Sequence, residues 1–190
     1  MEGGARFREV GSDLLVVVSA FLLFTGSYKV NEYFDSFMLF AAGVSLIYIP
    51  AGVKLLCLLV GGVPAILGLF VSSLYLNVLL WSTLTLTSAL YFATIGVGSY
   101  AMAVYLTKHY LSIKSDLSNL NYWHIVVLSV AASFFNGFGQ NFVYLTQGVT
   151  GSEEFLSKST AMAFGDFLGC FLIVMLFNSA IQAAKRLRSR

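Results

Sequence analysis

Charged residues are scarce in this sequence. Only 11% of its 190 residues are Asp, Glu, Lys or Arg, whereas 58% are hydrophobic. Soluble domains carry about 25% charged residues, so this deficit excludes an ordinary soluble enzyme and predicts an integral membrane protein. At about 20–25 residues a span, the chain has room for about six spans and none for a further soluble domain of about 50 residues.

Cysteine, proline and histidine are also rare, with two of each. Cys57 and Cys170 lie in apolar runs, which is typical of packing rather than of a disulfide or a metal site. His109 and His124 have no cysteine or carboxylate at ligand spacing, so no metal site is predicted. We find no nucleophile with a base, no phosphate loop and no zinc signature. The sequence therefore predicts no catalytic residue and no enzyme, and it leaves the cofactor unknown.

Long apolar runs separated by short polar loops make up most of the chain. They predict an all-α, polytopic integral membrane bundle of about six transmembrane helices. Pro50 is expected to break the second span, either as a kink or as the boundary between two half-helices. Gly61-Gly62-Val63-Pro64 predicts a turn. The predicted spans cover residues 13–30, 36–61, 63–80 and 82–107, a fifth that opens at Tyr122, and 159–184.

Lysine and arginine are unevenly distributed over the loops. The tails at 1–12 and 185–190 and the loop at 108–121 are basic, whereas the loops around Glu32 and Glu153 are acidic. The positive-inside rule then predicts that both termini are cytoplasmic, flanking a single transmembrane bundle over 13–184. A bacterial inner membrane is the expected location. The lipid bilayer and a membrane protein are the expected partners, and the basic tail is interpreted as a topology anchor rather than as a nucleic-acid site.

Two formal charges, on Lys54 and Asp166, lie inside apolar runs. A charge at the centre of a bilayer costs about 3 kcal/mol on insertion scales, so it usually faces the protein interior. Lys54 is interpreted either as an interior cation, which pairs with Asp166 or holds an anionic ligand, or as a side chain that snorkels to the cytoplasmic interface near Asp13. Asp166 is either a hydrogen-bonded structural carboxyl or a ligand or proton site.

Further interior positions are suggested by helix breakers, amides and glycines. Pro50 and Gly52 indicate irregular backbone beside Lys54, which at membrane depth is tolerated where it is buried or lines a cavity. The amides either bind a polar ligand or hydrogen-bond across helices, and glycines allow close helix packing. The candidate interior or ligand-binding residues are Pro50, Gly52, Lys54, Asn77, Asn136, Gln140, Asn141, Gly165, Asp166 and Gly169.

The order of several short motifs resembles the MASE1 family. They are the Pro50-Ala51-Gly52 helix within 48–56, the glycine pair at 61–62, the segment 69–77 ending in Asn77, the segment 93–106, and Gly165-Asp166-Phe167-Leu168-Gly169. The resemblance covers most of residues 40–180. It implies a membrane sensory module, which in that family usually precedes a cytoplasmic histidine kinase, diguanylate cyclase or phosphodiesterase domain. This sequence has fewer spans and ends at Arg190 without such a domain, so the resemblance implies a stand-alone sensor or adaptor.

The predicted function is therefore a non-enzymatic sensory or adaptor module. It is expected to bind a small ligand, or a partner's transmembrane helices, through its polar interior. Signalling would follow from a shift between two helix packings, which requires the ligand to favour one of them. Two alternatives remain open: the substrate-binding subunit of a vitamin-type transporter, and an accessory or assembly subunit of a larger membrane complex.

Overall fold

Five helices and one short hairpin form the protein in a computed structural model, which describes residues 2–41, 44–80 and 85–188. Each helix contains a stretch long and apolar enough to cross a membrane. The outward faces also carry large apolar side chains, such as Leu22, Leu67 and Leu176, as expected for contact with lipid. The helices are α1 (Glu2–Met38), α2 (Ile49–Leu80), α3 (Leu86–Tyr110), α4 (Tyr122–Thr146) and α5 (Ser152–Arg188).

The prediction of an all-α membrane bundle is thus confirmed, but the count of six helices is not matched. Residues predicted as the second and third spans belong to one interrupted helix, α2. The first and last helices are longer than predicted: α1 is helical from Glu2, and α5 extends from Ser152 to Arg188, into the basic segment. The start predicted for the fourth span, Ser82, lies outside the described residues.

The predicted span at 36–61 is helical at both ends, over 36–38 in α1 and from Ile49 in α2, but the described residues between them are not helical. After α1 ends at Met38, β1 (Leu39–Ala41) pairs with β2 (Val44–Ser45) in an antiparallel hairpin. Because α2 begins only at Ile49, Pro50 lies in its first turn instead of breaking a helix. The expected kink or break at Pro50 was therefore wrong: proline suits a first turn, where its missing N–H has no helical partner to lose.

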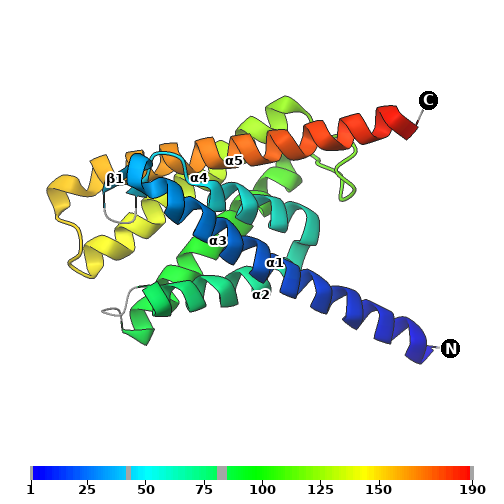
Figure 1. Ribbon diagram of the computed structural model, residues 1–190, viewed down its shortest axis with the longest axis horizontal. Helices are drawn as coiled ribbons and strands as arrows, with labels where there is room; N and C mark the ends of the chain where they lie inside the picture. Colours follow the sequence, from blue (N-terminus) through cyan, green and yellow to red (C-terminus); the bar gives the residue numbers. More distant parts are fainter. Residues whose placement is uncertain (1, 42–43, 81–84, 189–190) are drawn as a thin grey trace.

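The actual interruption of α2 is at Gly62, inside the predicted turn. Gly62 has φ 58° and ψ −137°, a conformation that side-chain-bearing residues rarely adopt. Contacts with α1 show that the chain reverses there. Ile49 N–H donates to Asn31 before the turn, whereas Thr25 and Ser72 are hydrogen-bonded after it. The two arms of α2 consequently run in opposite directions beside α1 (Figure 1).

The arms of α2 contact α1, α3 and α5, and α4 contacts α3 and α5. Both chain ends project toward one end of the bundle, and the β-hairpin lies at the other (Figure 1). The loop between α3 and α4 lies at the end of the termini, and the α4–α5 loop at the end of the hairpin. Because α2 doubles back, the chain passes between the two ends six times, although it contains five helices.

Candidate functional site

The side chain of Lys54 projects into the middle of the bundle. Only 5% of the residue is exposed, and its Nζ donates a hydrogen bond of 3.1 Å to the carbonyl oxygen of Gly96 on α3. The ammonium also lies 4.6 Å from the ring centroid of Tyr100 and 5.1 Å from that of Phe24. Such cation–π contacts are worth about 0.5–2 kcal/mol each, depending on desolvation. Lys54 therefore lies in the interior of the bundle, as one of its two interpretations expected, and does not snorkel toward Asp13.

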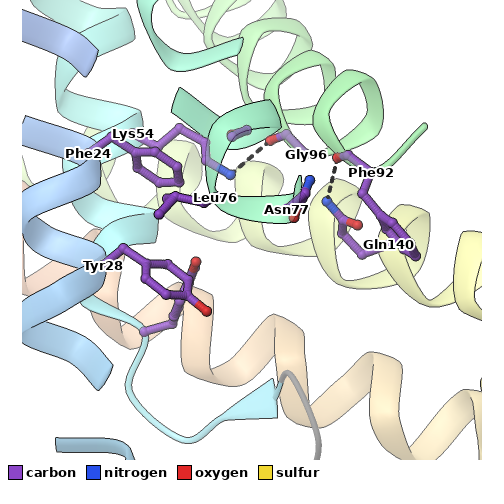
Figure 2. Close-up of a pocket in the computed structure, with 10 residues that line it drawn as sticks. Phe24, Tyr28, Lys54, Leu76, Asn77, Phe92, Gly96 and Gln140 are labelled. Carbon is purple, nitrogen blue, oxygen red and sulfur yellow. Dashed lines mark hydrogen bonds between the residues drawn. The ribbon is translucent and has the colours of Figure 1, made fainter. Parts of the chain in front are cut away.

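A cavity of about 80 Å³ adjoins the Lys54 ammonium. Figure 2 shows Lys54, Asn77 and Gln140 converging on it from the two arms of α2 and from α4. Gln140 is held in place because its Nε2 donates 3.0 Å to the Phe92 carbonyl, while Asn77 Nδ2 reaches the Ala89 carbonyl at 3.4 Å. The full lining is Phe24, Tyr28, Tyr48, Lys54, Ser73, Leu76, Asn77, Phe92, Gly96 and Gln140.

Asp166 belongs to a second polar cluster, between α4 and α5. It is 1% exposed, and its Oδ2 accepts a hydrogen bond of 2.6 Å from Asn136 Nδ2. The Tyr100 hydroxyl lies near the Asp166 carboxyl, but not at the distance and angles of a regular hydrogen bond. The buried Ser133 hydroxyl and Asn136 Oδ1 likewise lack a partner. Buried groups of this kind are usually satisfied by ordered water or by a bound ligand.

Lys54 and Asp166 do not form an ion pair. In the described part of the chain, the ion pairs join Lys29 to Glu32 and Lys158 to Glu154. Lys54 and Asp166 are near enough to interact electrostatically. Tyr100 contacts the Lys54 ammonium with its ring, and its hydroxyl lies near the Asp166 carboxyl. Tyr100 therefore links the two polar clusters.

The glycines around Asp166 bring backbone against backbone. A Cβ on Gly165 would overlap the Ser45 carbonyl oxygen, and one on Gly169 would overlap that of Tyr48. Gly165 O also accepts a hydrogen bond of 3.1 Å from Tyr48 N–H. The expected close packing is thus present, but its partner is the extended segment before α2 and not the face of another helix. Gly52, in the first turns of α2, packs in the same way on the Gly169 carbonyl.

The extended segment 44–48 is fixed from the other side by α1. Asn31, 2% exposed, accepts from Ile49 N–H at 2.9 Å and donates to Asp35 Oδ1 at 2.8 Å. Ser45 Oγ donates to the same Asp35 oxygen at 2.9 Å. These contacts satisfy the Ile49 N–H at the start of α2 and tie Asn31, Asp35 and Ser45 together. They also place Tyr48 at the wall of the cavity.

The other candidate residues are distributed over different surroundings. Asn136 and Gln140 share a face of α4 by spacing, yet Asn136 turns to α5 and Gln140 to α3. Asn141 is fully buried and donates to the Gly137 carbonyl in its own helix, away from the cavity lining. Pro50 starts a helix and does not line the cavity. Of the ten candidates, the cavity brings together Lys54, Asn77 and Gln140.

Sequence reasoning missed the aromatic part of this site. Tyr28, Tyr48 and Phe24 line the cavity, and Tyr100, which is fully buried, supports the Lys54 ammonium. Tyrosine near a span's end is typical of the membrane interface, so Tyr28 gave no interior signal. Tyr48 lies in the middle of the predicted span 36–61, where its residue type alone did not mark it as part of a site. Tyr100 was detectable, because a tyrosine in the midst of Gly96, Gly98 and small residues lies where another helix approaches.

No cluster of three or more metal-ligating His, Cys, Asp or Glu side chains occurs among the described residues. Comparison with protein-family models, curated proteins and solved structures finds no match to this chain. Its functional interpretation therefore rests on the geometry of the polar interior.

Proposed function

We propose that this protein is a non-enzymatic sensory or adaptor module of a membrane, in which a small polar ligand occupies the cavity at Lys54. The observation that carries this proposal is a buried ammonium at a cavity, without a carboxylate partner. A charge in such a position costs several kcal/mol and is seldom retained for stability alone. The resemblance to MASE1 sensory modules agrees with this proposal and remains part of it.

The position of the cavity gives a route from binding to signal. Its lining comes from α1, both arms of α2, α3 and α4, and Tyr48 belongs to the segment that rests on α5. A bound ligand would thus touch α1, both arms of α2, α3 and α4, and would reach α5 only through the segment that carries Tyr48. If it fits one arrangement of these helices better than another, it shifts the population toward that arrangement. A partner that reads this packing, such as a signalling protein in the same membrane, supplies the output.

The size of the cavity argues against a vitamin-type transporter subunit. Pockets for drug-sized ligands are about 300–1,000 Å³, whereas this cavity is about 80 Å³. A vitamin-sized molecule would require the helices to separate. The accessory-subunit alternative has one observation in its favour: only 11% of the apolar window of α1 is buried, compared with 33–44% in the other helices. That face of α1 is available to lipid or to a partner helix.

Gentle affinity purification from native membranes, followed by mass spectrometry of proteins and small molecules, tests the proposal. We expect a small polar molecule in wild-type protein, and its loss in Lys54→Met. A co-purifying kinase, cyclase or phosphodiesterase would identify the output. A stoichiometric assembly of many subunits that forms equally well with Lys54→Met, with no small molecule in either sample, would contradict a sensor and favour the accessory role.

A further inference from the structure

We propose that the cavity at Lys54 binds a short-chain carboxylate, with the ammonium as its counter-charge. This inference rests on the proposed function, because it names the class of ligand for the same cavity. The charge of the cavity lining, its hydrogen-bond donors, its apolar walls and its volume each restrict the class of ligand. All four are compatible with a short-chain carboxylate.

The charge of the lining favours an anion. Among the ten residues that line the cavity, Lys54 carries the formal charge and no Asp or Glu is present. An ammonium has three N–H donors, of which one bonds to Gly96 O. Asp166 is not in the lining, and Tyr100 lies against the ammonium. An anion in the cavity would therefore gain a charge-assisted hydrogen bond that a neutral molecule would not.

The donors and the apolar walls favour a carboxylate over a simple halide. Tyr28, Tyr48 and Ser73, which each carry a hydroxyl donor, line the cavity together with Lys54. This set offers enough donors to hydrogen-bond two oxygens of one ligand at once. Phe24, Leu76 and Phe92 form apolar parts of the same lining. A methyl or a short alkyl group fits against these side chains, while a bare ion would leave them unused.

The volume sets the upper limit. A water molecule needs roughly 10–15 Å³ of cavity measured in this way, and the whole cavity is about 80 Å³. This is room for roughly five to eight waters, or for one small molecule of comparable size. Formate and acetate meet this limit. A phospholipid headgroup or a tricarboxylate such as citrate is too large without rearrangement.

The test is an acetate titration of the purified full chain. The salt of a large organic anion, which does not fit the cavity, keeps the ionic strength constant as acetate is added. Thermal unfolding and isothermal calorimetry report binding, since a ligand that binds only the folded state raises its unfolding temperature. Acetamide, the neutral isostere, is titrated in parallel. The matched control variant is Lys114→Met, which removes an exposed lysine in the α3–α4 loop. We expect wild type and Lys114→Met to bind acetate saturably. Lys54→Met should bind acetate at least tenfold more weakly than wild type, and wild type should bind acetamide at least tenfold more weakly than acetate.

A second variant keeps the test valid should Lys54→Met not fold. Ser73→Met extends a side chain into the cavity while retaining the ammonium, and we expect it to abolish acetate binding. Equal binding of acetate and acetamide, unchanged by Lys54→Met, would overturn the carboxylate inference and leave a polar-ligand site intact. Acetate binding that survives both Lys54→Met and Ser73→Met would place the anion elsewhere. No binding of either probe to wild type would overturn the inference, and the mass spectrometry above then decides the proposed function separately.

Discussion

Lys54 is held in the bundle by neutral groups rather than by an anion. Its contacts are one carbonyl oxygen and the faces of two aromatic rings. These groups offset part of the cost of burying a charge and leave the ammonium able to bind something else. Tyr100 makes the closer ring contact, and its hydroxyl is buried without a hydrogen bond.

The two parts of the Tyr100 side chain are expected to have opposite effects on stability. Tyr100→Phe removes an unpaired buried hydroxyl and keeps the ring, so the unfolding free energy should stay within about 0.5 kcal/mol of wild type or rise. Tyr100→Leu removes the ring beneath the ammonium and should cost about 2–4 kcal/mol. Denaturant unfolding in detergent measures both. A large loss in Tyr100→Phe would mean that the hydroxyl bonds to Asp166 in the membrane.

Which residues of the site were predictable depends on how unusual they are for their surroundings. Lys54 and Asp166 were identified because a formal charge in an apolar run has few explanations. Asn77 and Gln140 were identified as polar side chains in spans, and both line the cavity. Tyr28 and Tyr48 were not, because their interior role comes from where the chain folds them. The separation of Asn136 from Gln140 likewise depends on which neighbour each side chain meets.

At the scale of elements, the hairpin and the extended segment before α2 are the least regular part of the fold. Residues 36–48 form an apolar run, and such a run does not distinguish helix from strand by itself. The conformation of this run depends on contacts with residues that are distant in the sequence. Gly165 and Gly169 leave room for the segment to pack against α5, and Asn31 accepts a hydrogen bond from the Ile49 N–H that follows it. The two glycines could be recognised in the sequence as a motif, but the segment that packs against them could not be predicted from it.

Alanine at Gly169 should disrupt this contact. The new Cβ would overlap the Tyr48 carbonyl oxygen, which is backbone and has little freedom to move. We expect a loss of about 1–3 kcal/mol or more in unfolding free energy, the usual cost of overpacking. The matched control is Gly98→Ala in α3, where nothing lies within 4 Å of the added Cβ. That variant should gain about 0.5–1 kcal/mol from helix propensity, and equal effects of the two changes would contradict the packing described here.

Gly62 is expected to be required for the reversal of α2. Its positive φ, together with ψ of −137°, lies in a region that is nearly restricted to glycine, so Gly62→Ala should cost about 1–3 kcal/mol. No neighbour lies within 4 Å of the added Cβ, so the loss would come from the backbone and not from a clash. Gly26→Ala, which is equally open but lies in the helical part of α1, serves as the control. Thermal unfolding of the pair isolates the backbone cost.

At the scale of the whole molecule, the reversal at Gly62 determines which loops share a side. With α2 doubled back, the termini and the α3–α4 loop lie at one end of the bundle, and the hairpin and the α4–α5 loop at the other (Figure 1). Lys108 and Lys114 mark the first end, while Glu32 and Glu153 mark the second. Lysine and arginine are enriched in cytoplasmic loops, so we propose that the end with the termini faces the cytoplasm.

Cysteine labelling with a membrane-impermeant reagent tests this orientation. Ser115→Cys, in the α3–α4 loop, and Ser152→Cys, at the start of α5, introduce thiols at exposed positions on opposite ends. We expect intact cells to label Ser152→Cys, and Ser115→Cys to react only after the membrane is permeabilised. The unaltered chain is the control, because Cys57 and Cys170 are buried and should react little in either state. Reversed labelling would invert the orientation. Labelling of both variants from one side would contradict the passage of α4 between the two ends of the bundle.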